Sequence, residues 1–138
     1  MLRAMIRIEL AISVFCQLGC SVDSRTHDDT VRFEFIHASN NEVMIAETSH
    51  EATIALVRAE LQKPMKERTL HISGSIADGT AANSREWSWH FIPGQWSMVE
   101  ASVELCDSWP SYIEENLENW IGEVRTFCPW ASRVNKEL

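Results

Sequence analysis

Apolar and polar residues alternate along several stretches of the chain, a pattern typical of β-strands with one buried and one exposed face. The stretch 31–37 (VRFEFIH) alternates in this way, and 42–47 (EVMIAE) is a second short run of the same kind. Only the short segment 38–41 (ASNN) separates the two, so we expect them to pair with each other. The stretch 68–79 (RTLHISGSIADG) predicts a third strand with Leu70, Ile72 and Ile76 facing inward.

Two further alternating runs lie on either side of a Pro-Gly pair. In WSWHF (87–91) the apolar positions are aromatic, and in SMVEASVELC (97–106) they are mostly aliphatic. Pro93 and Gly94 favour a turn between the runs, which predicts a hairpin. In that hairpin Trp87 and Trp89 point into the core, while Trp96 lies in the turn and is the tryptophan expected to be exposed.

Two segments show the spacing of amphipathic helices. The first follows TSHE, where Thr48 and Glu51 form a capping-box pattern, and it should end before Pro64. Its apolar stripe consists of Ile54, Val57 and Leu61, with Ala55 and Ala59 nearby.

The second helix begins near DSWPS, where Asp107 or Ser108 can cap it and Pro110 suits the first turn. Apolar residues then recur at helical spacing. This stripe consists of Ile113, Leu117, Trp120, Ile121 and Val124.

These elements predict a single α+β domain over residues 30–138. Strands with one polar face and helices with one apolar face are satisfied by two layers. We therefore expect a two-layer sandwich, in which a mostly antiparallel sheet of about five strands carries both helices on one face. The aromatic C-terminal segment, FCPWASRVNKEL, should pack back onto this domain.

The first residues have the features of a targeting signal. Arginines precede a short apolar run, and QLGC resembles the bacterial lipobox, in which Cys20 would be lipidated. We expect residues 1–20 to be a signal or lipoprotein-like segment and 21–29 to be a tether. Cleavage by ordinary signal peptidase and an uncleaved amphipathic start are the alternatives. Export would place the protein in the periplasm, on the outer membrane or outside the cell.

The charge of the chain limits its partners. Its 12 basic and 20 acidic residues leave a formal net charge of −8. Nucleic acids and anionic membranes require basic patches, so we expect neither as a partner, apart from membrane attachment through a lipid on Cys20. An acidic protein suits solubility or a partner with a cationic surface.

Cysteines Cys106 and Cys128 remain in the folded region once the N-terminal pair is set aside. In an oxidising compartment they would form a disulfide, whereas in the cytosol they would be two buried thiols.

The polar face of the predicted hairpin collects residues that bear chemistry. His90 would share that face with Glu100, Ser102 and Glu104, and His71 could join them from the preceding strand. Two histidines and two carboxylates could hold a divalent metal or an acid–base pair. Ser, His and Glu are also what an ordinary solvated sheet face carries.

Two common enzyme motifs are absent from the sequence. It contains neither G-x-S-x-G nor a phosphate-binding glycine loop. We therefore expect an exported domain that binds an unidentified protein or small ligand, rather than a catalyst. The alternatives are a metal-binding or hydrolytic protein that uses His71, His90, Glu100 and Glu104, and a structural protein of the cell envelope.

Three motifs resemble those of a known family. WSWHFIPGQW, VELCDSWPSYIEENL and FCPWASRV are similar to segments of small, mostly bacterial domains related to the N-terminal domain of a slime-mould calmodulin-binding protein. The family pattern is roughly W-S-[WF]-H-x-x-P, then E-x-C-D with P-x-x-[VI]-E, then C-P-W-[SA]-[SA]-R. The resemblance covers about residues 30–138.

The resemblance implies a shared domain but no established activity. Calmodulin binding is not implied, because calmodulin targets are basic amphipathic helices and the segment YIEENLENWIGEV is acidic. The matched motifs bring together His90, Glu104, Asp107 and Arg133. Asp107 and Arg133 could pair beside a Cys106–Cys128 bridge, either to pin the tail or as part of a site.

Overall fold

The computed structural model describes residues 29–80 and 86–138 of the chain. The expected signal segment 1–20, its Cys20, and the tether up to residue 28 lie outside the described residues. No helix within the described ranges has the length and apolar character needed to cross a membrane.

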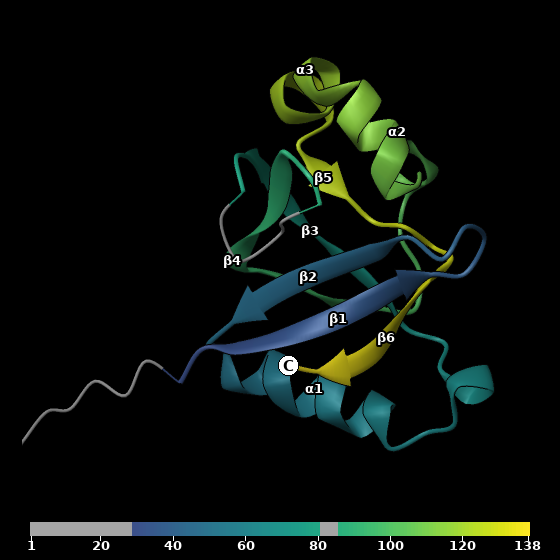
Figure 1. Cartoon of the computed structure of the whole chain (residues 1–138). Coiled ribbons are helices and arrows are strands. Elements are labelled where there is room, and N and C mark those ends of the chain that lie inside the picture. Colours follow the sequence, from purple (N-terminus) through teal and green to yellow (C-terminus); the bar gives the residue numbers. More distant parts are fainter. Residues whose placement is uncertain (1–28, 81–85) are drawn as a thin grey trace, which may run out of the picture.

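The first of two sheets contains the N-terminal hairpin and the C-terminal segment. Strands β1 (Val31–His37) and β2 (Val43–Thr48) pair antiparallel, which confirms the predicted hairpin. The C-terminal segment packs back, as expected, by forming a strand, β6 (Ser132–Glu137), that pairs antiparallel with β1. The strand order is β2-β1-β6, and Figure 1 shows these three strands side by side.

The second sheet has the order β4-β3-β5. Its strands are β3 (His71–Asp78), β4 (Trp89–Val99) and the two-residue β5 (Thr126–Phe127). The prediction of a single sheet of about five strands was therefore wrong, although the α+β class is correct. Alternation shows which face of a strand is buried, but it does not show which strands share hydrogen bonds.

The predicted hairpin around Pro93 and Gly94 was also wrong, because β4 runs through both residues. Trp96 lies opposite Gly74 and Phe91 lies opposite Ile76, so residues 92–95 bulge out where β3 contributes only one residue. Gly94 adopts a φ of 72°, which suits glycine in such a bulge. Residues after Val99 leave the sheet and lead into the short helix η3 (Glu104–Cys106).

Tryptophan side chains connect the two sheets. The indole N–H groups of Trp87 and Trp96 donate to the backbone carbonyls of Val43 and Glu47 in β2, each at 2.8 Å. Trp96 is only 4% exposed, so the expectation that it lies in an exposed turn was wrong. Trp89 is buried as predicted, with an edge-to-face contact to Phe127.

The first helix, α1 (Glu51–Leu61), is confirmed, but its cap differs from the expected one. His50 is the N-cap residue, and its Nδ1 accepts from the backbone N–H of Thr53 at 3.4 Å. Thr48 instead accepts from the N–H of His50 at 3.0 Å. A short helix, η1 (Met65–Glu67), follows α1.

The second predicted helix is divided into three pieces. These are α2 (Pro110–Glu115), α3 (Leu117–Asn119) and the π-helical turn η4 (Trp120–Val124). Its predicted apolar stripe is confirmed, since every member is buried or packs against the core. Neither Asp107 nor Ser108 caps α2, because Glu42 accepts from the N–H of Ser111 at 2.9 Å.

The helices lie at opposite ends of the molecule rather than on one face. Figure 1 shows α1 below the β2-β1-β6 sheet, with α2 and α3 at the other end, next to β5. Packing from both ends is possible because the core lies between the two sheets. Its largest fully buried side chains include Phe33, Phe35, Met44, Ile72, Trp89, Phe91 and Phe127.

Candidate functional site

The four residues predicted to share one polar face do not form one cluster. His71 lies opposite Val99 and His90 opposite Ala77, so the two positions are six residues apart along β3. At about 3.3 Å per residue, this is roughly 20 Å along the strand. The proposed single metal or acid–base cluster was therefore wrong, because it depended on the hairpin that β4 does not form.

His90 and Glu104 occupy separate surroundings. His90 is 8% exposed, and its Nδ1 lies 2.8 Å from the carbonyl oxygen of Gly79. Glu104 is exposed at the start of η3. Within the described ranges, no group of three or more His, Cys, Asp or Glu side chains could hold a metal ion.

A disulfide fixes the segment that covers β3 near His71. Cys106 and Cys128 are bonded, with their Cα atoms 5.2 Å apart, which confirms the predicted pairing. The backbone N–H of Cys128 donates to the carbonyl of Cys106 at 2.8 Å. Asp107 adds a third link, because its Oδ1 accepts from the N–H of Trp130 at 2.9 Å. The segments around residues 106 and 128 are therefore held as one unit.

This unit forms a small pocket over the N-terminal end of β3. The pocket has a volume of about 220 Å³. It is lined by His71, Glu100, Ala101, Ser102 and Trp130. The strand β3 supplies the histidine, and the two segments joined by the disulfide supply the other residues.

A hydrogen-bonded chain crosses this pocket. The indole N–H of Trp130 donates to the Oγ of Ser102 at 2.8 Å, and the same Oγ lies 2.7 Å from Nε2 of His71. An indole nitrogen can only donate, so the Oγ of Ser102 accepts from Trp130. The bond between Ser102 and His71 runs from the hydroxyl to Nε2 in the histidine tautomer that leaves Nε2 unprotonated. The ring of Trp130 is thereby held in place although 42% of the residue is exposed.

The environment of His71 favours its neutral form. Burial lowers the pKa of His71, the charge of Arg133 lowers it further, and the charge of Asp107 opposes these effects. A pKa below the usual 6.5 leaves the imidazole uncharged at neutral pH. A neutral imidazole has one unprotonated nitrogen, so one of its two tautomers can accept the proton of Ser102 at Nε2.

Asp107 and Arg133 lie near the same loop. Both are among the described residues, and they do not form an ion pair with each other. Asp107 accepts from the backbone of Trp130, while Nη1 of Arg133 donates to the carbonyls of Trp130 and Ser132 at 2.8 and 2.6 Å. The expected direct pairing was therefore wrong, yet both side chains fix the residues around Trp130.

Glu60 holds the start of the strand that carries His71. Its carboxylate is buried and accepts from the N–H groups of Thr69 and Leu70 at 2.7 and 3.1 Å, and from Lys63 at 2.6 Å. Burial alone would raise the pKa of Glu60, but the hydrogen bonds from Lys63, Leu70 and Thr69 outweigh it and lower the pKa. Glu60 is therefore a charged anchor for β3.

Large apolar side chains are exposed in residues 103–112, the stretch that directly follows the pocket residue Ser102. We define the apolar surface as Val103, Leu105, Trp109 and Tyr112, which are 67%, 78%, 49% and 42% exposed. The rings of Trp109 and Tyr112 are in edge contact, with centroids 5.7 Å apart. Trp130 belongs to the pocket, and the disulfide joins its segment to the one that carries Leu105.

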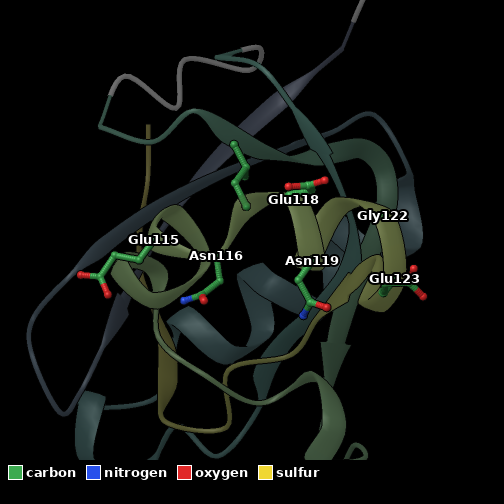
Figure 2. Close-up of a pocket in the computed structure, with 7 residues that line it drawn as sticks. Glu115, Asn116, Glu118, Asn119, Gly122 and Glu123 are labelled. Carbon is green, nitrogen blue, oxygen red and sulfur yellow. The ribbon is translucent and has the colours of Figure 1, made fainter.

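A second, acidic hollow lies at the end of the molecule that contains α2 and α3. It has a volume of about 560 Å³ and is lined mainly by residues of α2, α3 and η4. Figure 2 shows the side chains of Glu115, Glu118 and Glu123 pointing in different directions rather than toward one another. These carboxylates do not converge on a common ligand position.

Residues of the family motifs form hydrogen bonds that connect separate elements of the fold. Ser88 donates through its N–H and Oγ to the carboxylate of Glu114, at 2.9 and 2.5 Å, which ties β4 to α2. The family model of the BP-74 N-terminal domain matches residues 29–138. The chain belongs to this family. A search of curated proteins and a search of solved structures each found no match.

In this member of the family most matched polar residues have partners inside the protein. Ser88 binds Glu114, His90 binds the Gly79 carbonyl, and Asp107 binds the backbone of Trp130. Trp130 also has an internal partner, Ser102, but 42% of the residue is exposed. It was not predicted as a site residue, although its position directly after Cys128-Pro129 favours a rigid aromatic ring at the surface.

Proposed function

We propose that the domain is an interaction module that binds a partner protein through the apolar surface and the adjoining pocket. The exposure of the apolar surface carries this proposal. Leaving Leu105 and Val103 in water forgoes about 1.5 kcal/mol or more for each side chain. Large exposed apolar side chains that are gathered in one segment, as these are in residues 103–112, are typical of interaction sites.

The rigidity of the surface supports the same function. The disulfide and the Asp107–Trp130 hydrogen bond fix the segment before a partner arrives. A fixed surface loses less conformational entropy on binding than a mobile loop does. Trp and Tyr are also the residues that most often contribute strongly to protein interfaces.

Charge indicates the kind of partner. Glu100, Glu104 and Asp107 border the apolar surface, and the chain as a whole carries a net charge of −8. A partner segment with apolar residues beside lysine or arginine would complement both features. The proposed partner is therefore a protein with an exposed, basic and apolar segment.

A peptide selection tests this function. Random peptides of about 12 residues, long enough to cover a surface of this size, are displayed on phage and selected on the intact domain and, in parallel, on the variant Leu105→Asp. We expect enriched peptides to combine apolar and basic residues, and to bind Leu105→Asp about tenfold or more weakly. Recovery of the same peptides on both proteins would contradict the proposal.

A matched control shows whether the effect of Leu105→Asp is specific to the apolar surface or follows from placing a charge at any exposed apolar residue. Met65 is also exposed, at 42%, but belongs to η1 and not to the segment 103–112 that carries the apolar surface. The variant Met65→Asp should bind the enriched peptides as tightly as the unmodified domain. Circular dichroism of both variants checks that each remains folded.

Export of the domain is part of the proposal. It is supported by the N-terminal signal pattern and by the disulfide, since disulfides persist mainly in oxidising compartments. Cell fractionation of the full chain and of Cys20→Ala tests it, because loss of membrane attachment only in the variant would indicate lipidation. Recovery of the full chain in the cytosol would contradict export.

A further inference from the structure

The pocket has a composition that suits a positively charged group. One wall is the indole of Trp130, whose electron-rich face attracts cations. Glu100 lines the same pocket, is exposed, and forms no ion pair among the described residues. An accessible carboxylate beside a fixed indole ring is the usual combination for binding an ammonium or guanidinium group.

The hydroxyl of Ser102 adds a directed acceptor. Its oxygen accepts from the indole N–H of Trp130 and has a second lone pair. In the tautomer of His71 that leaves Nε2 unprotonated, Ser102 donates to that nitrogen, and the second lone pair can accept from a cationic donor that enters the pocket.

The charges around the pocket also favour a cation. Glu100 and Asp107 each contribute a negative charge, whereas Arg133 contributes one positive charge. Arg133 is engaged with the carbonyls of Trp130 and Ser132. His71 is neutral at pH 7, so the local sum is one negative charge.

We propose that the pocket between Glu100 and Trp130 binds the cationic group of a lysine or arginine side chain presented by the partner. This inference rests on the proposed interaction function and specifies one residue type that the partner supplies. The apolar surface then binds the apolar neighbours of that side chain. The pocket volume of about 220 Å³ accommodates the end of one such side chain.

Single amino-acid probes test the pocket without a protein partner. The uncharged-backbone derivatives N-acetyl-lysine methylamide, N-acetyl-arginine methylamide and N-acetyl-norleucine methylamide are titrated into the ¹⁵N-labelled domain. The indole N–H signal of Trp130 reports occupancy. We expect the two cationic probes to bind at least about fivefold more tightly than the neutral norleucine probe.

Two carboxylate variants provide the matched comparison. Glu100→Gln should weaken binding of the cationic probes about three- to tenfold, with little effect on the norleucine probe. Glu115→Gln, which removes a carboxylate of α2 that lines the other hollow and not this pocket, should leave all three titrations unchanged. Equal binding of the lysine and norleucine probes, or unaltered binding by Glu100→Gln, would overturn the proposal.

The two proposals fail in different ways. In one case, peptide binding depends on Leu105 but not on Glu100, and the probes bind equally whatever their charge. That result would support the interaction module and contradict the cation pocket. In the other case, the cationic probes bind more tightly than the neutral probe, but the peptide selection yields no sequence whose binding depends on Leu105. That result would support the cation pocket and contradict the protein-binding function.

Discussion

The indole N–H of Trp96 donates a hydrogen bond to the backbone carbonyl of Glu47 across the gap between the two sheets, at 2.8 Å. β4 and β2 belong to different sheets, so this side chain supplies a link that no strand pairing provides. The ring also contacts Phe35 edge to face, with centroids 5.6 Å apart. Trp96 therefore has two roles: it donates a hydrogen bond to the Glu47 carbonyl, and its ring fills part of the core.

Replacing Trp96 by Phe should destabilise the domain strongly. The variant leaves the Glu47 carbonyl without its partner and creates a cavity, so we expect a loss of about 2 to 4 kcal/mol in unfolding free energy. Trp87→Phe removes an equivalent bond to Val43 from a half-buried site and should cost about 1 kcal/mol. Urea unfolding measures both; equal losses would contradict the assigned roles.

Gly74 should not tolerate a side chain. A Cβ at this position would collide with the Cβ and Cα of Trp96 and with the carbonyl of Gln95. Backbone atoms cannot move aside as a flexible side chain can, so Gly74→Ala should cost about 3 kcal/mol or more. Gly122→Ala is the control, because its Cβ would meet nothing within 4 Å. Thermal unfolding of the two variants checks this difference, and similar melting temperatures would refute it.

Removing the disulfide should lower stability without altering the core. Cys106 and Cys128 are 22 residues apart in the sequence, and closing a loop of that size contributes about 3 kcal/mol. The double variant Cys106→Ser/Cys128→Ser and the reduced native chain should therefore show the same lowered urea midpoint. A midpoint unchanged by reductant would show that the bond does not stabilise the fold.

Acidification should destabilise the domain through His71 first. Its pKa is lowered in the folded state, so the unfolded chain binds the proton more tightly, and stability falls as pH drops below about 6.5. Glu60, whose folded pKa is also lowered, adds a loss only below about 4.5. Unfolding free energies of the native chain and of His71→Gln are measured from about pH 7.5 to about pH 5, above the range in which Glu60 contributes. Both proteins share the other histidines, so the difference between the two curves reports His71, and the curves should converge on acidification. Parallel curves would exclude His71 as the cause.

Local patterns in the sequence were enough to predict several elements. The hairpin of β1 and β2, the helix α1, and the buried stripe that includes Ile113 and Trp120 follow from alternation or helical spacing alone. The Cys106–Cys128 pairing also followed, because a domain expected in an oxidising compartment contained only these two cysteines. The burial of Trp89 was predicted in the same way as the strands.

The site required information that local patterns do not contain. His71 alternates as an outward residue, yet it is 3% exposed because the disulfide-linked segments cover that end of β3. His90 and Glu100 were expected to share a face only because Pro93-Gly94 was interpreted as a hairpin turn. In the structure β3 pairs with β4 on both sides of the bulge, and this keeps the strand continuous.

The α+β class, most of the apolar faces and the family motifs could be predicted from the amino-acid sequence, because each depends on composition or on residues close together in the chain. The enclosure of the core by two sheets, the burial of Trp96, and the meeting of His71, Ser102 and Trp130 in one pocket became evident only in the folded structure. Those relationships depend on which distant segments pair and cover one another, and strand alternation carries no information about that choice.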